Sequence, residues 1–300
     1  FQDRVIERFK KPASAKILLL LPCSAKKPYS FSKSHKLFRE CFLNQANPFV
    51  VHEVILTSPL GLVPRELELT YPASIYDIAV TGHWDEDEKK MMRTLLQRYL
   101  QKNTYDATIL HIPPVMQTFV SDLLKNPQVT CKDSPTSAES LSALSNALQG
   151  LTQRYDRVRP QRRAYENLTS LACYQFGPAL AKLLMKGCTI SGKYPYQKIM
   201  DQNIQLGMLT EERGLLSLTM DGANRIGETE HYWVEISDDF TLKGSVFAPG
   251  IKDADDSIRI GEEVLIKKKN RLCGVGVALM NGKEMIESTH GEAIKIRHHI

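Results

Sequence analysis

Residues 16–22 read KILLLLP, and the polar stretch CSAKKPYSFSKSH follows them at 23–35. The first segment is an uninterrupted apolar run, which is typical of a strand buried on both faces of a sheet. Two similar segments, VHEVILT at 51–57 and DATILHI at 106–112, lie further along the chain and are separated by helical patterns. This order predicts an α/β domain with a mostly parallel sheet. Because such sheets bind ligands at the carboxyl ends of their strands, residues 23–35 begin where we expect a site.

Several segments have the apolar spacing of helices. Ser34 is a candidate N-cap for a helix over 35–45. An acidic first turn predicts the start of a helix over 85–101. Further helices are predicted over 116–126 and 137–150.

Changes in sequence pattern along the chain predict three domains. Residues 1–150 are expected to form the α/β core domain, residues 151–227 a small α+β domain, and residues 228–300 a β-barrel. The last region has short alternating strands with glycine turns, and we expect Asn281-Gly282 to close a hairpin there.

The composition is that of a globular protein, with 42% hydrophobic and 24% charged residues among 300. None of the six cysteines has the CxxC spacing of a zinc ribbon or a redox pair. The apolar run is too short to span a bilayer, and nothing resembles a signal peptide. We therefore expect a cytoplasmic protein with no metal, no cofactor and no membrane contact. Since the chain begins with Phe1, we expect native sequence to precede it.

The charges are unevenly distributed. Residues 1–50 hold ten Lys and Arg against three Asp and Glu, and residues 151–226 hold eleven against six. Residues 227–300 are net acidic, with ten against thirteen. Such blocks are either solvated surface or a stripe that attracts phosphates, and only a nucleic-acid partner favours the second interpretation.

The C-terminal region resembles a PUA domain, an RNA-binding barrel. The resemblance rests on GEEVLI at 261–266, GVGVA at 274–278 and GEAIKI at 291–296. It implies that Val264 and Ile266 point into the barrel. A small basic patch is expected to contact RNA, and its residues are Lys267, Lys268 and Lys269.

The loop at 22–35 resembles the signature of the archaeosine synthase family: Pro-Cys, three residues, Lys-Pro-Tyr, two residues, Ser, two residues, His. All seven fixed positions are present at this spacing. The resemblance extends over residues 14–125 and 153–226 as well as the barrel. Full-length members carry an upstream region related to tRNA-guanine transglycosylase that this chain lacks. It is therefore expected to be a short or split form, or a form that kept the loop and lost the activity.

The resemblance implies a reaction and its partners. The family acts on tRNA that carries 7-cyano-7-deazaguanine in its D-arm, and adds an amine, thought to be that of lysine, to the nitrile. A partner radical enzyme then cleaves the adduct. The substrates are therefore expected to be tRNA and an amine donor, and the partners a transglycosylase or a radical enzyme.

The same loop has residues suited to attack on a nitrile. Cys23 ends a buried strand, and we expect Lys26 and Lys27 to lower the pKa of its thiol. His35 or Lys27 would move protons. The expected catalytic residues are thus Cys23, Lys27 and His35. The residues expected to bind the base are Pro28, Tyr29, Ser32 and Arg65.

Simpler interpretations stay open for each residue. Cys23 is a small core residue in one of them, Lys26 and Lys27 are solvated, and His35 only caps or packs. Arg65 with Glu66, after a Gly-Leu-Val-Pro turn, forms a surface ion pair or lines the pocket. Residues in and beside the long connection that follows, and a histidine at a strand end, are further candidates: Tyr71, Asp77, His83, Trp84 and His111.

Two other functional classes remain. A non-catalytic subunit would position tRNA for a separate transglycosylase. A thiol hydrolase or glycosylase-like enzyme would use the same scaffold for other chemistry.

Overall fold

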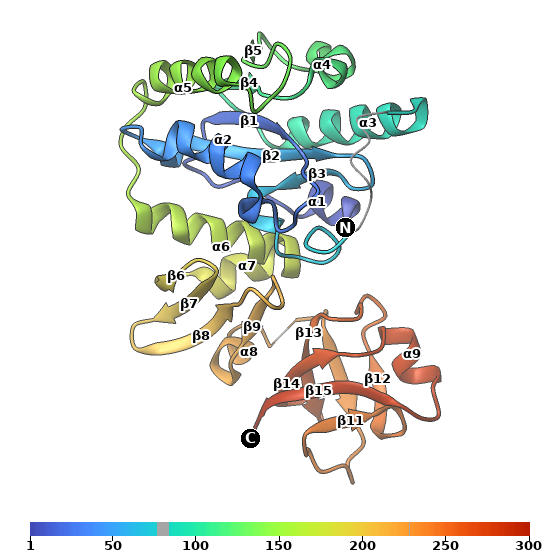
Figure 1. Cartoon of the computed structure of the whole chain (residues 1–300). Coiled ribbons are helices and arrows are strands. Elements are labelled where there is room, and N and C mark those ends of the chain that lie inside the picture. Colours follow the sequence, from blue (N-terminus) through green and yellow to red (C-terminus); the bar gives the residue numbers. More distant parts are fainter. Residues whose placement is uncertain (77–83, 228) are drawn as a thin grey trace. The chain divides into compact units, whose positions relative to one another are not determined.

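The computed structural model describes residues 1–76, 84–227 and 229–300 (Figure 1). It divides into two compact units, the first made of Phe1–Pro178 and Glu212–Gly214, the second of Ala179–Glu211 and Leu215–Ile300. The three-domain division at residues 150 and 227 stays a prediction. Within the described residues, no helix is both long and apolar enough to cross a membrane.

The first unit is built on a five-stranded sheet with the order β3-β2-β1-β4-β5. β1 pairs in parallel with β2 and β4, β4 pairs in parallel with β5, and only β3 runs antiparallel, at the edge beside β2. The predicted α/β class with a mostly parallel sheet is confirmed. The strands are β1 (Ile17–Pro22), β2 (Val51–Thr57), β3 (Gly61–Pro64), β4 (Ala107–Leu110) and β5 (Gln128–Val129).

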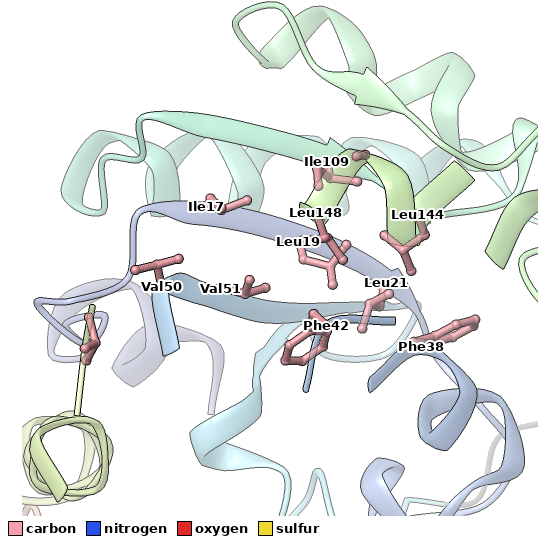
Figure 2. Close-up of a cluster of buried hydrophobic side chains, with 12 residues drawn as sticks. Ile17, Leu19, Leu21, Phe38, Phe42, Val50, Val51, Ile109, Leu144 and Leu148 are labelled. Atoms are coloured by element: carbon pink, nitrogen blue, oxygen red, sulfur yellow. The ribbon is translucent and has the colours of Figure 1, made fainter. Parts of the chain in front are cut away.

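Both faces of β1 are buried, as the run of leucines requires. Ile17, Leu19 and Leu21 point toward side chains of α2 (Lys33–Leu43) and α5 (Ala138–Thr152), as Figure 2 shows. Side chains alternate along a strand, so Leu18 and Leu20 lie on the opposite face, where they too are fully buried.

Helices α1 (Gln2–Glu7) and α3 (Glu86–Lys102) cover that opposite face. Both pack against β3, and the ring of His52 in β2 stacks on Phe9, which follows α1. α3 begins at the predicted place, where the side chain of Asp85 accepts from the N–H of Glu88 in a capping box.

The segment Gly61–Pro64 is a strand, not the predicted turn. Gly61 has a φ of +74°, and an added Cβ would lie 2.3 Å from Cδ1 of Leu95. Glycine therefore permits both the left-handed backbone and the close approach of α3, and the chain can turn directly from β2 into an antiparallel neighbour.

The remaining helices of the first unit agree broadly with their predicted places. The helix predicted over 116–126 is shorter, since a 3-10 turn at Ser121–Leu123 ends it. The helices are α4 (Pro114–Val120) and α6 (Pro160–Phe176). Helix α7 (Pro178–Met185) begins at the last residue of this stretch and otherwise belongs to the second unit. Further 3-10 turns are η1 (Tyr29–Phe31), η2 (Pro48–Val50) and η3 (Arg65–Leu67).

The second unit holds two sheets. An antiparallel four-stranded sheet has the order β6-β7-β8-β9, and helix α8 (Met220–Ile226) packs on β8. Its strands are β6 (Thr189–Lys193), β7 (Tyr196–Asp201), β8 (Ile204–Leu209) and β9 (Leu216–Leu218).

The other sheet is the predicted C-terminal barrel, with the order β11-β15-β14-β13-β10-β12. Val264 and Ile266 lie in its core with no exposed surface, so their predicted inward orientation is confirmed. Its strands are β10 (Trp233–Ile236), β11 (Ser245–Phe247), β12 (Ile251–Ala254), β13 (Glu263–Lys268), β14 (Arg271–Ala278) and β15 (Glu292–His299).

The predicted hairpin at Asn281-Gly282 is wrong. Asn281 is the N-cap of helix α9 (Gly282–Glu287), and it forms a capping box with Glu284. Gly282 is required for a different reason, because an added Cβ would lie 2.1 Å from the carbonyl oxygen of Asp255. Thus a short helix, not a turn, connects β14 to its antiparallel partner β15.

Candidate active site

The candidate site begins where β1 ends. The N–H of Cys23 donates to the carbonyl of Leu56 at 3.1 Å, so the residue after β1 is still tied to β2. The parallel register pairs Pro22 with Leu56, and the next residue of β2 is Thr57. The side chains of Cys23 and Thr57 therefore meet at the carboxyl edge of the sheet.

A chain of polar side chains extends from this point. Thr57 lies beside Cys23, and its hydroxyl favours the ionised form of the thiol, which lowers the thiol pKa against the larger effect of burial. Its Oγ1 lies 2.5 Å from the hydroxyl oxygen of Tyr76, which lies 2.5 Å from that of Tyr29. Thr57 and Tyr29 are buried, whereas Cys23 and Tyr76 are half-buried. Four side chains from three separate segments are thus connected in one order.

Lys27 adds a positive charge to this chain. Its Nζ lies 3.7 Å from the centroid of the Tyr76 ring, within the range of a cation–π contact. Of the residues predicted to act on substrate, the structure therefore brings together Cys23, Lys27 and Tyr29.

The protonation of these groups differs from the prediction. Burial raises the pKa of the Cys23 thiol, and the opposing effects of the Thr57 hydrogen bond and the Lys27 charge are smaller. Burial and Tyr76 likewise raise the pKa of Tyr29. The expected lowering of the thiol pKa is therefore wrong, because desolvation outweighs the nearby charge. In the resting protein the cysteine is a thiol rather than a thiolate.

His35 is fully buried and both of its ring nitrogens have partners. Nε2 lies 3.0 Å from the carbonyl oxygen of Pro22, and Nδ1 lies 2.8 Å from Nη2 of Arg65. Burial and the Arg65 charge lower the pKa of His35 to about 3. The ring is therefore neutral. These contacts suit a positioning residue, and an acid–base role for His35 stays a prediction.

Arg65 lies in a buried ionic network. Its guanidinium pairs with Glu53, and Nη1 donates to Oε2 of Glu68 at 2.8 Å. The same carboxylate oxygen accepts from the N–H of Ser30 in the loop at 2.8 Å. Of the two alternatives for Arg65 with Glu66, the surface ion pair is wrong, because Arg65 pairs with the buried carboxylates of Glu53 and Glu68. The network instead ties the loop to β2 and η3. That Arg65 binds the base stays a prediction.

Ser32 and Pro28 shape the loop. Ser32, not the predicted Ser34, is the N-cap of α2, since its Oγ accepts from the N–H of His35 at 3.2 Å. The carbonyl of Pro28 accepts from the N–H of Phe31 at the start of η1. Their binding to a base stays a prediction.

The weaker candidates have structural partners or lie elsewhere. Glu66 Oε2 lies 2.9 Å from Nε2 of His52; burial acts to raise the pKa of Glu66, but His52 and the Arg163 charge outweigh it and lower that pKa to about 2. His111 uses both ring nitrogens, on Thr130 and on the carbonyl of Pro135. Trp84 packs on Phe119, and Tyr71 is 73% exposed. Asp77 and His83 fall outside the described residues.

Sequence reasoning missed Thr57 and Tyr76. For Thr57 a signal existed, because it ends the second predicted parallel strand and so lies at the same edge as Cys23. For Tyr76 the only signal was its place in a long connection.

Of the predicted RNA-binding lysines, Lys267 and Lys268 end β13, and Lys269 lies in the turn to β14. Nζ of Lys268 donates to the carbonyl of Phe240 at 3.0 Å, and Nζ of Lys269 lies 3.9 Å from Oδ2 of Asp238. Lys267 is half-buried. Two of the three ammonium groups therefore have contacts within the barrel, and RNA contact by these lysines stays a prediction. Across the described ranges, no group of His, Cys, Asp and Glu is arranged to hold a metal ion.

Comparison with known proteins gives two domain matches. Residues 1–148 match a domain of unknown function (DUF5591), and residues 237–300 match the PUA domain. A solved structure of a protein of unknown function has a TM-score of 0.72 at 28% identity, covering 100% of this chain and 99% of that one.

Two relatives extend this similarity to almost the whole chain. Archaeosine synthase subunit alpha of Methanosarcina acetivorans is 40% identical over 99% of this chain and 49% of its own length. Archaeosine synthase of Haloferax volcanii is 39% identical over 99% of this chain and 51% of its own. The predicted resemblance to the archaeosine synthase family is thereby confirmed. The chain spans about half the length of these relatives.

Proposed function

We propose that this chain takes part in forming archaeosine in tRNA, by adding an amine to the nitrile of 7-cyano-7-deazaguanine in the D-arm. The observation that carries this proposal is the similarity to archaeosine synthases over 99% of the chain. The proposed amine donor is lysine. A separate transglycosylase would insert the base, and a radical enzyme would process the product.

The residues at the carboxyl edge of the sheet support a covalent route. The thiol of Cys23 adds across the C≡N bond, so that sulfur binds carbon and the proton goes to nitrogen. The amine then displaces the sulfur and leaves a substituted amidine, while the thiol regains its proton. Splitting the addition in this way is the usual gain of nucleophilic catalysis. The charge of Lys27, which lies over Tyr76, would favour the anionic sulfur in both steps.

The barrel supports a role in holding tRNA. PUA domains bind RNA, and residues 237–300 match this domain. We assign Lys267, Lys268 and Lys269 to phosphate contacts, and Pro28, Tyr29, Ser32 and Arg65 to the pocket for the base. Attraction of phosphates by lysines makes such binding depend on salt.

The test is to incubate the chain with tRNA that already carries the cyano base, and with lysine, glutamine or ammonium in separate reactions. Mass analysis of the nucleosides is expected to show an adduct with lysine alone. A tRNA with guanine at the same position is the matched control. No adduct with any amine, from a folded protein that binds the tRNA, would contradict the proposal.

A second candidate is a non-catalytic subunit that positions tRNA for a separate enzyme. Two observations favour it: burial raises the pKa of the Cys23 thiol, and both ring nitrogens of His35 are engaged. This candidate predicts tight binding of tRNA without any adduct. The same incubation therefore separates the two.

A further inference from the structure

We propose that Thr57 and Tyr76 form a proton path that connects the Cys23 thiol to the substrate, with Tyr29 holding Tyr76 in place. This inference rests on the proposed function and deepens it by naming two residues that neither the loop motif nor the domain matches assign. Both side chains lie outside the motif, one at the end of β2 and the other after η3.

The geometry places these groups in sequence along one edge of the sheet. Cys23 and Thr57 follow the paired residues Pro22 and Leu56 at the edge of the sheet, and Oγ1 of Thr57 lies 2.5 Å from the Tyr76 hydroxyl. A hydroxyl can donate one proton and accept another at the same time, so each of these groups can pass on a proton and remain neutral. The Tyr29 hydroxyl, 2.5 Å from that of Tyr76, fixes the direction in which Tyr76 points.

The proposed reaction needs such a route. When the sulfur attacks the nitrile carbon, one C–N π bond breaks and the nitrogen must gain a proton. The thiol loses one at the same time. The path passes the thiol proton to Thr57, and the proton of Thr57 to Tyr76. Tyr76 gives its own proton to the nitrogen before the proton of Thr57 reaches it, so both hydroxyls end as they began.

The second step runs the route in reverse. The amine attacks the carbon of the thioimidate, the C–S bond breaks, and the sulfur leaves with the electron pair. The amine loses one proton, which returns through Tyr76 and Thr57 to the sulfur. No oxidant, reductant or external base is consumed.

The position of Lys27 fits this role. Its ammonium lies 3.7 Å from the centre of the Tyr76 ring, where a cation favours the anionic form of a phenol. It would therefore stabilise the phenolate that forms when Tyr76 gives up its proton. A purely structural role would require only that these hydroxyls satisfy one another's hydrogen bonds.

The test compares Thr57→Val and Tyr76→Phe with Thr57→Ser, which keeps the hydroxyl. Turnover is expected to fall about a hundredfold in the first two variants, a typical loss for a proton-transfer group, and to stay within a few-fold in Thr57→Ser. Tyr71→Phe is the matched control, because Tyr71 is exposed in the same segment. Folded Thr57→Val and Tyr76→Phe proteins with near-normal turnover would overturn the path.

A second readout does not depend on archaeosine chemistry. The rate at which iodoacetamide alkylates Cys23, followed by mass analysis of its peptide, is measured against pH. Loss of the Thr57 hydrogen bond is expected to move this profile to higher pH in Thr57→Val, while Thr57→Ser and Tyr71→Phe keep the wild-type profile. If the wild type makes no adduct but the profile shifts, the connection of Thr57 to the thiol stands and the proposed function fails. An unchanged Thr57→Val profile overturns the path whatever the turnover.

Discussion

Nη2 of Arg65 lies 2.8 Å from Nδ1 of His35, and this contact decides what the histidine can do. An arginine can only donate, so Nδ1 must accept, and the ring proton lies on Nε2, which donates to the carbonyl of Pro22. The histidine of the motif is therefore held in one neutral tautomer. It joins the end of β1 to a buried ionic network.

Stability is expected to fall as the pH is lowered. Burial lowers the pKa of His35 to about 3 and that of His111 to about 4, whereas the unfolded chain protonates histidine near pH 6.5. Between these values the unfolded state binds more protons, so the free energy of unfolding falls by about 1.4 kcal/mol per pH unit for each such histidine. Urea unfolding at pH 7, 6 and 5 measures this slope. His35→Gln should reduce it, and His298→Gln, at an exposed position, should not.

Arg65→Met is expected to lower the free energy of unfolding by about 3 kcal/mol, because the buried carboxylates of Glu53 and Glu68 would lose the charge that they share. Urea unfolding measures the loss. Arg98→Ala, which removes an exposed ion pair with Glu7, is the control and should leave the midpoint nearly unchanged. Equal midpoints for the two variants would show that the buried network is not needed for the fold.

Asn281→Ala is expected to lower the free energy of unfolding by about 1 kcal/mol, since it removes the N-cap of α9. In the structure an added Cβ at Gly282 meets the Asp255 carbonyl at 2.1 Å. Gly282→Ala should therefore be the more damaging variant in thermal unfolding.

Lys267→Ala combined with Lys269→Ala is expected to weaken binding of tRNA and to flatten its dependence on salt. Each lost phosphate contact reduces the slope of log affinity against log salt by about 0.7–0.9. Lys283→Ala removes an exposed lysine elsewhere in the barrel and serves as the control. Binding of tRNA is titrated at several salt concentrations for the wild type and both variants. If all three proteins show the same dependence of affinity on salt, Lys267 and Lys269 do not contact the RNA.

Deleting residues 228–300 would be a poorer test of RNA binding. The side chain of Glu263 in the barrel accepts from the N–H of Leu218 in β9 at 2.8 Å. It also pairs with Arg297. Truncation would therefore leave the Leu218 amide without its partner and perturb the neighbouring sheet. Point substitutions avoid this ambiguity.

The sequence predicted those features whose cause is local. The apolar run KILLLLP requires a strand that is buried on both faces. The acidic first turn of α3 favours the start of a helix, because negative charges stabilise a helix N-terminus. Asn281-Gly282 misled because asparagine suits both a tight turn and an N-cap, and the choice depends on the close approach of Asp255. The conformation there is set by tertiary contact.

The same distinction between local and tertiary causes holds for the candidate site. The loop motif identified Cys23, Lys27 and Tyr29, which the structure brings together. It gave no sign that Arg65 enters a largely buried ionic network, because Glu53 reaches it only through the pairing of β2 with β3. Nor did it show that desolvation outweighs the Lys27 charge at the thiol, since burial is a property of the whole fold.

The central claim is that the Cys23 thiol forms a covalent adduct with the nitrile, and Cys23→Ser tests it most directly. One sulfur becomes one oxygen, so melting temperature and tRNA affinity should stay nearly unchanged. The single-turnover rate should fall about a thousandfold or more, roughly 4 kcal/mol in the barrier. A folded Cys23→Ser protein that binds tRNA and forms the adduct at a near-normal rate would contradict the account.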